Sequence, residues 1–225
     1  WPIVMVIDPH PRKKDGTAVV ASAANNSICD FRLTLTTAVP VTTADVTGAT
    51  TVYCAPYGGN RIALYDGSST WNIRTSAEFS LALGTLTSGI PYDVFCYDNA
   101  TVPTLEFLAW TNDTTRATAL TLQDGVLVKT AATTRRYLGT FYTTSTTTTE
   151  DSFAKRDLWN YYNRVSRPMR VVDTTNSWTY TTATWRQANA ATGNQVECVT
   201  GVAEGNIRAT AYGTASNSAN NVNIA

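Results

Sequence analysis

The chain has 225 residues with 17 basic groups, 17 acidic groups and one histidine, and only 15% of its residues are charged. A neutral chain with so few charges lacks the basic excess of a general nucleic-acid binder, so we expect no nucleic-acid partner. It contains 40 threonines but only 5 glutamates and 4 lysines. Threonine favours strands, whereas Glu and Lys favour helices, so the composition predicts a mainly β protein with a surface rich in hydroxyls and amides.

Residues 1–30 are expected to form an extended N-terminal arm. The stretch Asp8–Gly16 is rich in proline and charge, and Ala21–Ser27 is small and polar. The apolar opening, Trp1–Ile7, is too short to cross a bilayer, and no run approaches 18 apolar residues. We therefore expect no membrane insertion.

Residues 31–149 are expected to form an antiparallel β-sandwich, jelly-roll-like or a barrel. Short apolar runs recur at the spacing of about 8–12 residues that such folds show. Asp66-Gly67 and Asp124-Gly125 are strong hairpin signals. The predicted strands cover residues 31–36, 50–55, 61–65, 69–74, 79–83, 92–97, 104–110, 119–122, 126–128 and 137–142. The tract of threonines at 143–149 is expected to be an exposed strand or a linker.

Residues 150–172 are expected to form a linking helix and a connector. Thr148–Asp151 has the spacing of a capping box, and the helix is predicted over residues 152–163. Phe153, Leu158, Trp159 and Tyr162 would share one broad apolar face of it, and Pro168 lies just beyond its end.

Residues 173–225 are expected to begin a second β-sandwich unit. Alternating runs at 177–186 and 195–201 and a short run at 207–212 predict three strands. Three strands are marginal as an independent unit, and the amide-rich end has no closing signal. We therefore expect this unit to be incomplete.

The four cysteines, Cys29, Cys54, Cys96 and Cys198, include no C-x-x-C pair, which excludes a zinc ribbon or a thioredoxin-like motif. Each lies in or beside a strand-like run. Four small buried thiols and a Cys54–Cys96 bridge between strands both remain open.

No catalytic residue, metal site or cofactor is expected. The one histidine, His10, lies between two prolines in the arm, and no nucleotide-binding glycine motif is present. A glycosidase would need only two carboxylates, and Asp93, Asp98, Glu106 and Asp113 are close in sequence, so this activity remains a minor alternative. Turn formation and solvated strand edges would equally explain these four residues.

The stretch from Lys155 to Arg170 concentrates arginine among aromatic residues. This composition is typical of a subunit interface, although a plain surface helix or a site for single-stranded nucleic acid would also show it. The candidate interface residues are Phe153, Arg156, Trp159, Tyr161, Tyr162, Arg164, Arg167 and Arg170.

Tryptophans are spread through the predicted strands. Trp71, Trp110 and Trp178 are candidates for stacking on sugar rings in a glycan-binding module, and burial in a β core is the alternative interpretation.

Several multi-residue strings carry a resemblance that covers about residues 31–200. They are Arg32–Asp45, Tyr57–Gly67, Ala109–Ala117, Leu122–Val126, Thr133–Thr140, Trp159–Val165 and Arg167–Arg170. Together they resemble a family of tailed-bacteriophage virion proteins labelled tail-fibre-like or minor structural.

The resemblance implies a non-enzymatic structural component of the virion, such as a fibre, a spike or a capsid decoration protein. It would be a homo-oligomer, expected to be a trimer, that contacts other virion proteins on the extracellular particle. Host attachment through a surface glycan would be compatible with this role. The family brings no catalytic residues with it.

Overall fold

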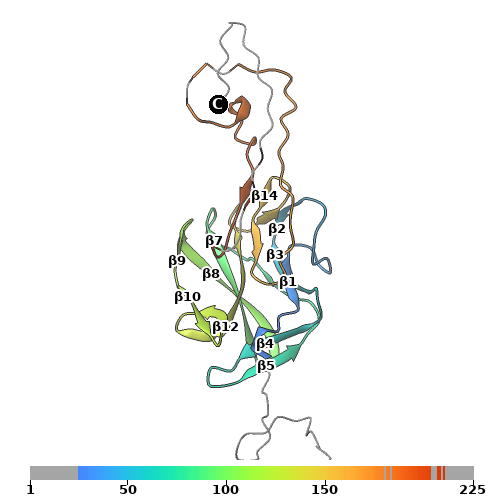
Figure 1. Ribbon diagram of the computed structural model, residues 1–225, viewed down its shortest axis with the longest axis vertical. Coiled ribbons are helices and arrows are strands. Elements are labelled where there is room, and N and C mark those ends of the chain that lie inside the picture. The colour runs from blue at the N-terminus through green and yellow to red at the C-terminus, as the bar shows by residue number, and fades with distance from the viewer. Residues whose placement is uncertain (1–24, 180, 183, 204–206, 209, 211–225) are drawn as a thin grey trace, which may run out of the picture.

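The computed structural model describes residues 25–179, 181–182, 184–203, 207–208 and 210. These residues form a mainly β structure of antiparallel sheets, one of which curls into a half-barrel. Two 3-10 turns, η1 (Asn25–Ser27) and η2 (Ala188–Ala190), are the helical elements of this part of the chain, which contains no α-helix. Figure 1 shows a β body from which the segment that carries η2 rises along the long axis.

The largest sheet has seven strands in the order β10-β11-β12-β7-β8-β9, with β15 added beside β12. Because side chains alternate along a strand, Tyr92, Val94 and Cys96 enter the core, whereas Asp93 and Phe95 belong to the other face. The strands are β7 (Pro91–Asn99), β8 (Val102–Asn112), β9 (Thr115–Arg116), β10 (Leu120–Gln123), β11 (Val126–Lys129), β12 (Ala132–Tyr142) and β15 (Leu158–Asn160).

A three-stranded sheet lies across the core from this half-barrel. Its order is β1-β3-β6, with β1 at Phe31–Thr34, β3 at Thr51–Pro56 and β6 at Phe79–Ala82. At its two edges, β1 lies beside β15 and β6 lies beside β8. The apolar side chains of both sheets meet between them, among them Phe31, Leu33, Val52, Val94 and Phe141.

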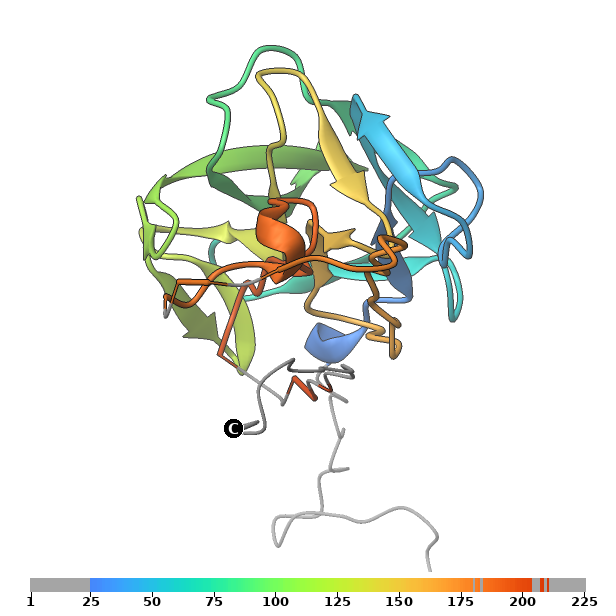
Figure 2. The same cartoon turned by 90° about the horizontal axis from the view of Figure 1, so that it is seen from above.

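Two smaller sheets complete the body (Figure 2). The hairpin of β4 (Arg61–Tyr65) and β5 (Trp71–Thr75) turns at Asp66-Gly67, as predicted, and packs against β12. The four-stranded sheet has the order β16-β14-β13-β2, and its β14–β16 pair is parallel. Its strands are β2 (Val46–Ala49), β13 (Thr149–Asp151), β14 (Lys155–Arg156) and β16 (Glu197–Cys198).

The strands predicted between residues 31 and 142 are all present, within a few residues of their expected ends. The threonine tract is not an exposed strand but a tight turn. Thr143 and Thr149 pair with each other and are fully buried, while the hydroxyls of Thr144 and Ser145 contact that of Thr148.

The predicted helix over residues 152–163 is wrong. This stretch contains β14 and β15, and the predicted capping box falls on β13. The period of the side chains is two, not 3.6: Leu158 and Tyr162 pack on the core, while Trp159 and Tyr161 lie against Tyr137 on the other face. Tryptophan and tyrosine fit a half-buried strand well, and the empty edge of β12 supplies the hydrogen-bond partner.

The predicted second β unit is also absent from the described part of residues 173–225. Residues 177–186 contain no strand where they are described, and 195–201 contribute only the two residues of β16, which join the sheet of the body. The run at 207–212 lies mostly outside the described residues.

The cysteines are free thiols. Cys29, Cys54 and Cys96 are buried in one core cluster, where burial raises the pKa of each thiol. Cys198 is exposed, so the expectation of a buried thiol holds for three of the four, and no Cys54–Cys96 bridge forms.

A fully buried arginine anchors the start of the described chain to the body. Arg136 on β12 donates from Nη1 to the carbonyl oxygens of Asn26 (2.8 Å), Ile28 (3.0 Å) and Ala63 (2.7 Å). Its guanidinium also lies 4.6 Å from the ring centre of Tyr162. Residues 25–30, the described end of the predicted arm, therefore pack on the body, whereas residues 1–24 of that arm lie outside the described chain.

Two asparagine side chains join the three-stranded sheet to the seven-stranded sheet. The backbone N–H of Leu33 donates to Oδ1 of Asn160 (2.7 Å), and Nδ2 of Asn160 donates to the Leu33 carbonyl (3.0 Å). Nδ2 of Asn163 donates to the carbonyls of Cys29 (2.9 Å) and Phe31 (2.8 Å). The amides thus satisfy backbone groups of β1 that no neighbouring strand pairs.

Asn160→Asp should lower the free energy of unfolding by about 3 kcal/mol. The substitution removes the donor to the Leu33 carbonyl and places a carboxylate in the buried seam, the contact between β1 and residues 158–163. Urea denaturation would measure the change. Asn112→Asp is the matched control, since Oδ1 of Asn112 only accepts bonds from Thr114 and a carboxylate can do the same. Equal stability of the two variants would contradict this account of the seam.

Candidate functional site

Two of the predicted interface arginines are engaged inside the body. Nη1 of Arg156 lies 2.9 Å from Oδ1 of Asp151, and Nη1 of Arg167 lies 3.1 Å from Oδ2 of the same carboxylate. Arg156 also donates from Nη2 to the carbonyl of Pro168 (2.8 Å). Asp151 and Arg156 are buried, so this cluster fixes the path of the chain between β13 and Pro168.

The other predicted interface residues fall into two groups. The Phe153 ring lies between Arg156 and Arg170, whose guanidinium carbons are 5.1 and 5.2 Å from its centre. Trp159 contacts Tyr137, Tyr161 and Arg164, and Tyr162 lies against Arg136. The structure therefore does not gather these residues on one helix face; Arg164 and Arg170 are the exposed members of the set. Their role between subunits stays a prediction.

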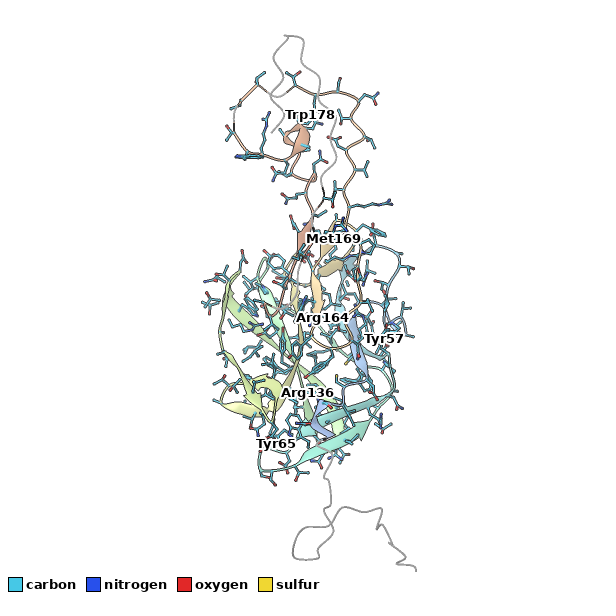
Figure 3. All side chains as sticks on the ribbon, viewed as in Figure 1. Tyr57, Tyr65, Arg136, Arg164, Met169 and Trp178 are labelled. Atoms are coloured by element: carbon cyan, nitrogen blue, oxygen red, sulfur yellow. The ribbon has the colours of Figure 1, made fainter. Side chains whose placement is uncertain are left out.

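The three candidate tryptophans for glycan stacking lie in three different places. Trp71 is half-buried on β5 and donates from Nε1 to Asp124 (2.9 Å). Trp110 is only 8% exposed, and Arg116 lies 4.3 Å from its ring centre. Trp178 is 45% exposed and lies on the segment that leaves the body (Figure 3).

Three of the four carboxylates considered for a glycosidase are held in ion pairs. Asp93 pairs with Arg116 (2.8 Å), Asp98 with Arg74 (2.5 Å), and Glu106 with Lys129 and Arg135 (2.9 Å each). Burial raises the pKa of Asp93, and Arg116 opposes that effect. The fourth residue, Asp113, lies elsewhere, in the wall of a cleft.

This cleft is the most site-like feature of the described residues, with a volume of about 410 Å³. It lies where the chain returns to the body through β16, so residues far apart in sequence meet in it. Its walls are formed by Pro91, Trp110, Asp113, Tyr142, Asp157, Glu197, Cys198, Val199 and Thr200. Residues 197–200 form the wall made by the returning chain. The N–H of Glu197 donates to the Ala154 carbonyl (2.9 Å) and the N–H of Val199 to the Arg156 carbonyl (3.0 Å). Just beyond this wall, Nη2 of Arg116 donates to the Gly201 carbonyl.

Asp157 is the unusual group of this cleft. As a residue it is only 3% exposed, and what remains exposed opens into the cleft, where no described side chain pairs with its carboxylate. Burial raises its pKa to about 7; Lys155 acts against this, while the charges of Glu150, Glu197 and Asp151 add to it. Lys155 is shared between the two carboxylates, because it also pairs with Glu197 at 3.2 Å.

The carboxylates of the cleft also raise the pKa values of two neighbouring groups. Burial raises the pKa of the Tyr142 hydroxyl, and so do the charges of Asp113, Asp157 and Glu197. Burial also raises the pKa of the Cys198 thiol, with Asp157 as a second cause. The carboxylates of the cleft are therefore close enough to act together.

Sequence reasoning missed this site. Asp157 lies inside the predicted helix, and Glu197 lies 40 positions further along the chain. A signal was nevertheless present, since three carboxylates, Glu150, Asp151 and Asp157, flank Lys155 and Arg156 at the start of the arginine-rich stretch.

The second notable feature is a long projection, residues 171–196, that leaves the body and returns to it at nearly the same point. Arg170 N–H bonds to the Phe153 carbonyl and Glu197 N–H to the Ala154 carbonyl, both at 2.9 Å. Between these anchors the described residues form no strand, and η2 is their one helical element (Figures 1 and 2). Trp185 is fully exposed there.

Hydrogen bonds between polar side chains give the projection its internal contacts. Asn194 donates from Nδ2 to Asp173 (2.8 Å), Asn189 donates to Thr175 (3.1 Å), and Gln187 donates to Gln195 (2.7 Å). Loops longer than about 15 residues without regular structure are uncommon in compact domains and are usually either functional or linker segments.

The described residues contain no group of three or more His, Cys, Asp or Glu side chains arranged to hold a metal ion. Within the same residues, no helix is long and apolar enough to cross a bilayer. His10, the expected non-catalytic histidine, lies outside the described residues.

Comparison with known proteins finds no matching family model, no matching curated protein and no matching solved structure.

Asp157→Asn should make the protein more stable than the wild type at pH 8, because the charged form of Asp157 is the one that burial disfavours. A folded-state pKa near 7 against an ordinary value of 3.8 means that the wild type gains stability as pH falls from 8 towards 4, so the difference should vanish near pH 4. One pKa unit corresponds to about 1.4 kcal/mol. We therefore expect the free energy of unfolding of Asp157→Asn to exceed that of the wild type by more than about 1 kcal/mol at pH 8, measured by urea denaturation.

Asp66→Asn provides a control of opposite sign. Backbone N–H groups of Ser68, Ser69 and Thr70 bond to the Asp66 carboxylate and lower its pKa to about 2. Loss of the Asp66 carboxylate should therefore lower the free energy of unfolding above pH 4. A pH-independent effect of Asp157→Asn would refute the assigned burial of a carboxylate.

Proposed function

We propose that this chain is a non-enzymatic structural component of a tailed-bacteriophage virion, such as a fibre, a spike or a decoration protein. It would act on the extracellular particle and assemble with copies of itself, as a trimer, and with other virion proteins. The jelly-roll-like or barrel class of its body is part of this proposal, supported by the placement of β1 beside β15 and of β6 beside β8.

The projection of residues 171–196 is the observation that carries the assembly role. Most described residues of this segment are exposed, and the fully exposed indole of Trp185 presents a large apolar group to water. Tryptophan is among the residues most enriched at the energetic centres of protein interfaces. The segment is best explained as a contact element whose partner is another chain.

A receptor-binding role on a host-surface glycan is the second candidate function. It is favoured by the position of Trp178, whose indole is 45% exposed on the same projection.

Deleting the projection should convert an oligomer into a monomer. Residues 171–196 can be replaced by a short Gly-Ser linker, because their two anchors bond to the adjacent residues Phe153 and Ala154. Light scattering should give a multiple of the 24.3 kDa chain mass for the wild type and the monomer mass for the deletion variant.

Trp185→Ala tests the same contact without altering the loop, and Trp71→Phe is its control, since Trp71 is half-buried in the body. We expect Trp185→Ala to weaken association and Trp71→Phe to leave the mass unchanged. A wild-type chain that is monomeric at every concentration would contradict the assembly role, and particle images that lack the chain would contradict the virion location.

A further inference from the structure

The cleft beside β16 is lined by acidic side chains, and such a lining suits a positively charged ligand. Asp113, Asp157 and Glu197 line it, and Glu150 adds to the potential at Asp157. Against these acidic groups, Lys155 is the cation that acts on Asp157, and it is engaged with Glu197. The other nearby carboxylate, Asp151, is neutralised by Arg156 and Arg167.

An acidic surface alone would not make a site, because exposed carboxylates are commonly solvated by water. Asp157 is different, since it is 97% buried as a residue, lines the cleft and has no partner for its carboxylate within the described chain. A carboxylate in such a place either takes up a proton, as the pKa of about 7 allows, or is paired with a cationic ligand that keeps it ionised.

The shape and lining of the cleft restrict what that ligand can be. A volume of about 410 Å³ falls in the range of about 300–1,000 Å³ that small-molecule sites occupy. Trp110, Tyr142, Pro91 and Val199 supply apolar wall area, and the side chains present do not form a metal-binding group. An organic cation therefore fits better than a bare metal ion.

We propose that this cleft binds a small organic cation, a protonated primary amine carried on a scaffold the size of a monosaccharide or of a lysine side chain. The ammonium group lies against the carboxylate of Asp157 and is also attracted by the negative charges of Glu197 and Asp113. The scaffold packs on Trp110 and Tyr142. One wall of the cleft begins at Glu197, directly after the projection, but no residue of the projection itself lines the cleft, so amine binding and assembly are measured separately.

Protonation of Asp157 opposes this binding, because a neutral carboxyl group attracts an ammonium group only weakly. The groups that set its charge are Lys155, Glu150, Asp151 and Glu197, with Asp113, Tyr142 and Cys198 on the facing walls. Amine binding should therefore weaken as pH falls through 7, and it should release protons from Asp157 when it occurs near pH 7.

The test is a titration of the full chain at pH 8 by isothermal calorimetry with three probes. Glucosamine, partly protonated near this pH, and Nα-acetyl-lysine methylamide carry the amine on the two scaffolds. N-acetylglucosamine has the sugar ring without the charge. We expect at least one amine to bind about tenfold more tightly than N-acetylglucosamine, and the tighter of the two identifies the scaffold.

Asp157→Asn should weaken amine binding about tenfold, and Glu197→Gln should also weaken it. Glu106→Gln is the matched control, because Glu106 lies outside the cleft in its own ion pairs, and it should leave binding unchanged. Absence of binding by both amines, equal binding of N-acetylglucosamine, or full binding by Asp157→Asn would each overturn the proposal. Light scattering on the same samples reports assembly separately.

Discussion

The body of this protein depends on one edge of β1: the other edge pairs with β3, but this one pairs with a side chain instead of with a second strand. Asn160 offers Leu33 one acceptor and one donor, which is what an antiparallel neighbour would offer. Because Asn160 itself belongs to β15, and β15 pairs with β12, this amide links the three-stranded sheet to the seven-stranded sheet. Without it, a buried edge of β1 would face the core with unsatisfied backbone groups.

Arg136 performs a related task at the other end of the same seam. A buried guanidinium usually meets a carboxylate, but here its partners are backbone carbonyls of residues 26, 27, 28 and 63. The arginine binds several segments at once because its donors diverge in a planar fork. Together, Asn160, Asn163 and Arg136 hold the start of the described chain against residues 158–163, which explains the density of polar side chains in a buried region.

The sequence predicted the strands between residues 31 and 142 because alternation and Asp-Gly turns are local signals. It failed at residues 152–163, where Leu158, Trp159 and Tyr162 fit one face of a helix as well as two faces of a strand. Whether this segment forms a helix or a strand is decided by the free edge of β12, which pairs with β15. The local periodicity of the sequence does not reveal this partner. The cleft was missed for the same reason, since Asp113, Asp157 and Glu197 meet only after the chain has folded.

The composition of the projection has a consequence for the conditions in which its contacts form. Between residues 171 and 196 the sequence contains one acidic residue, Asp173, and one basic residue, Arg186, among many hydroxyls and amides. Salt screens interactions between exposed charges. Contacts made through this segment would therefore depend little on charge screening, so that moderate changes in ionic strength would leave the same interface in place.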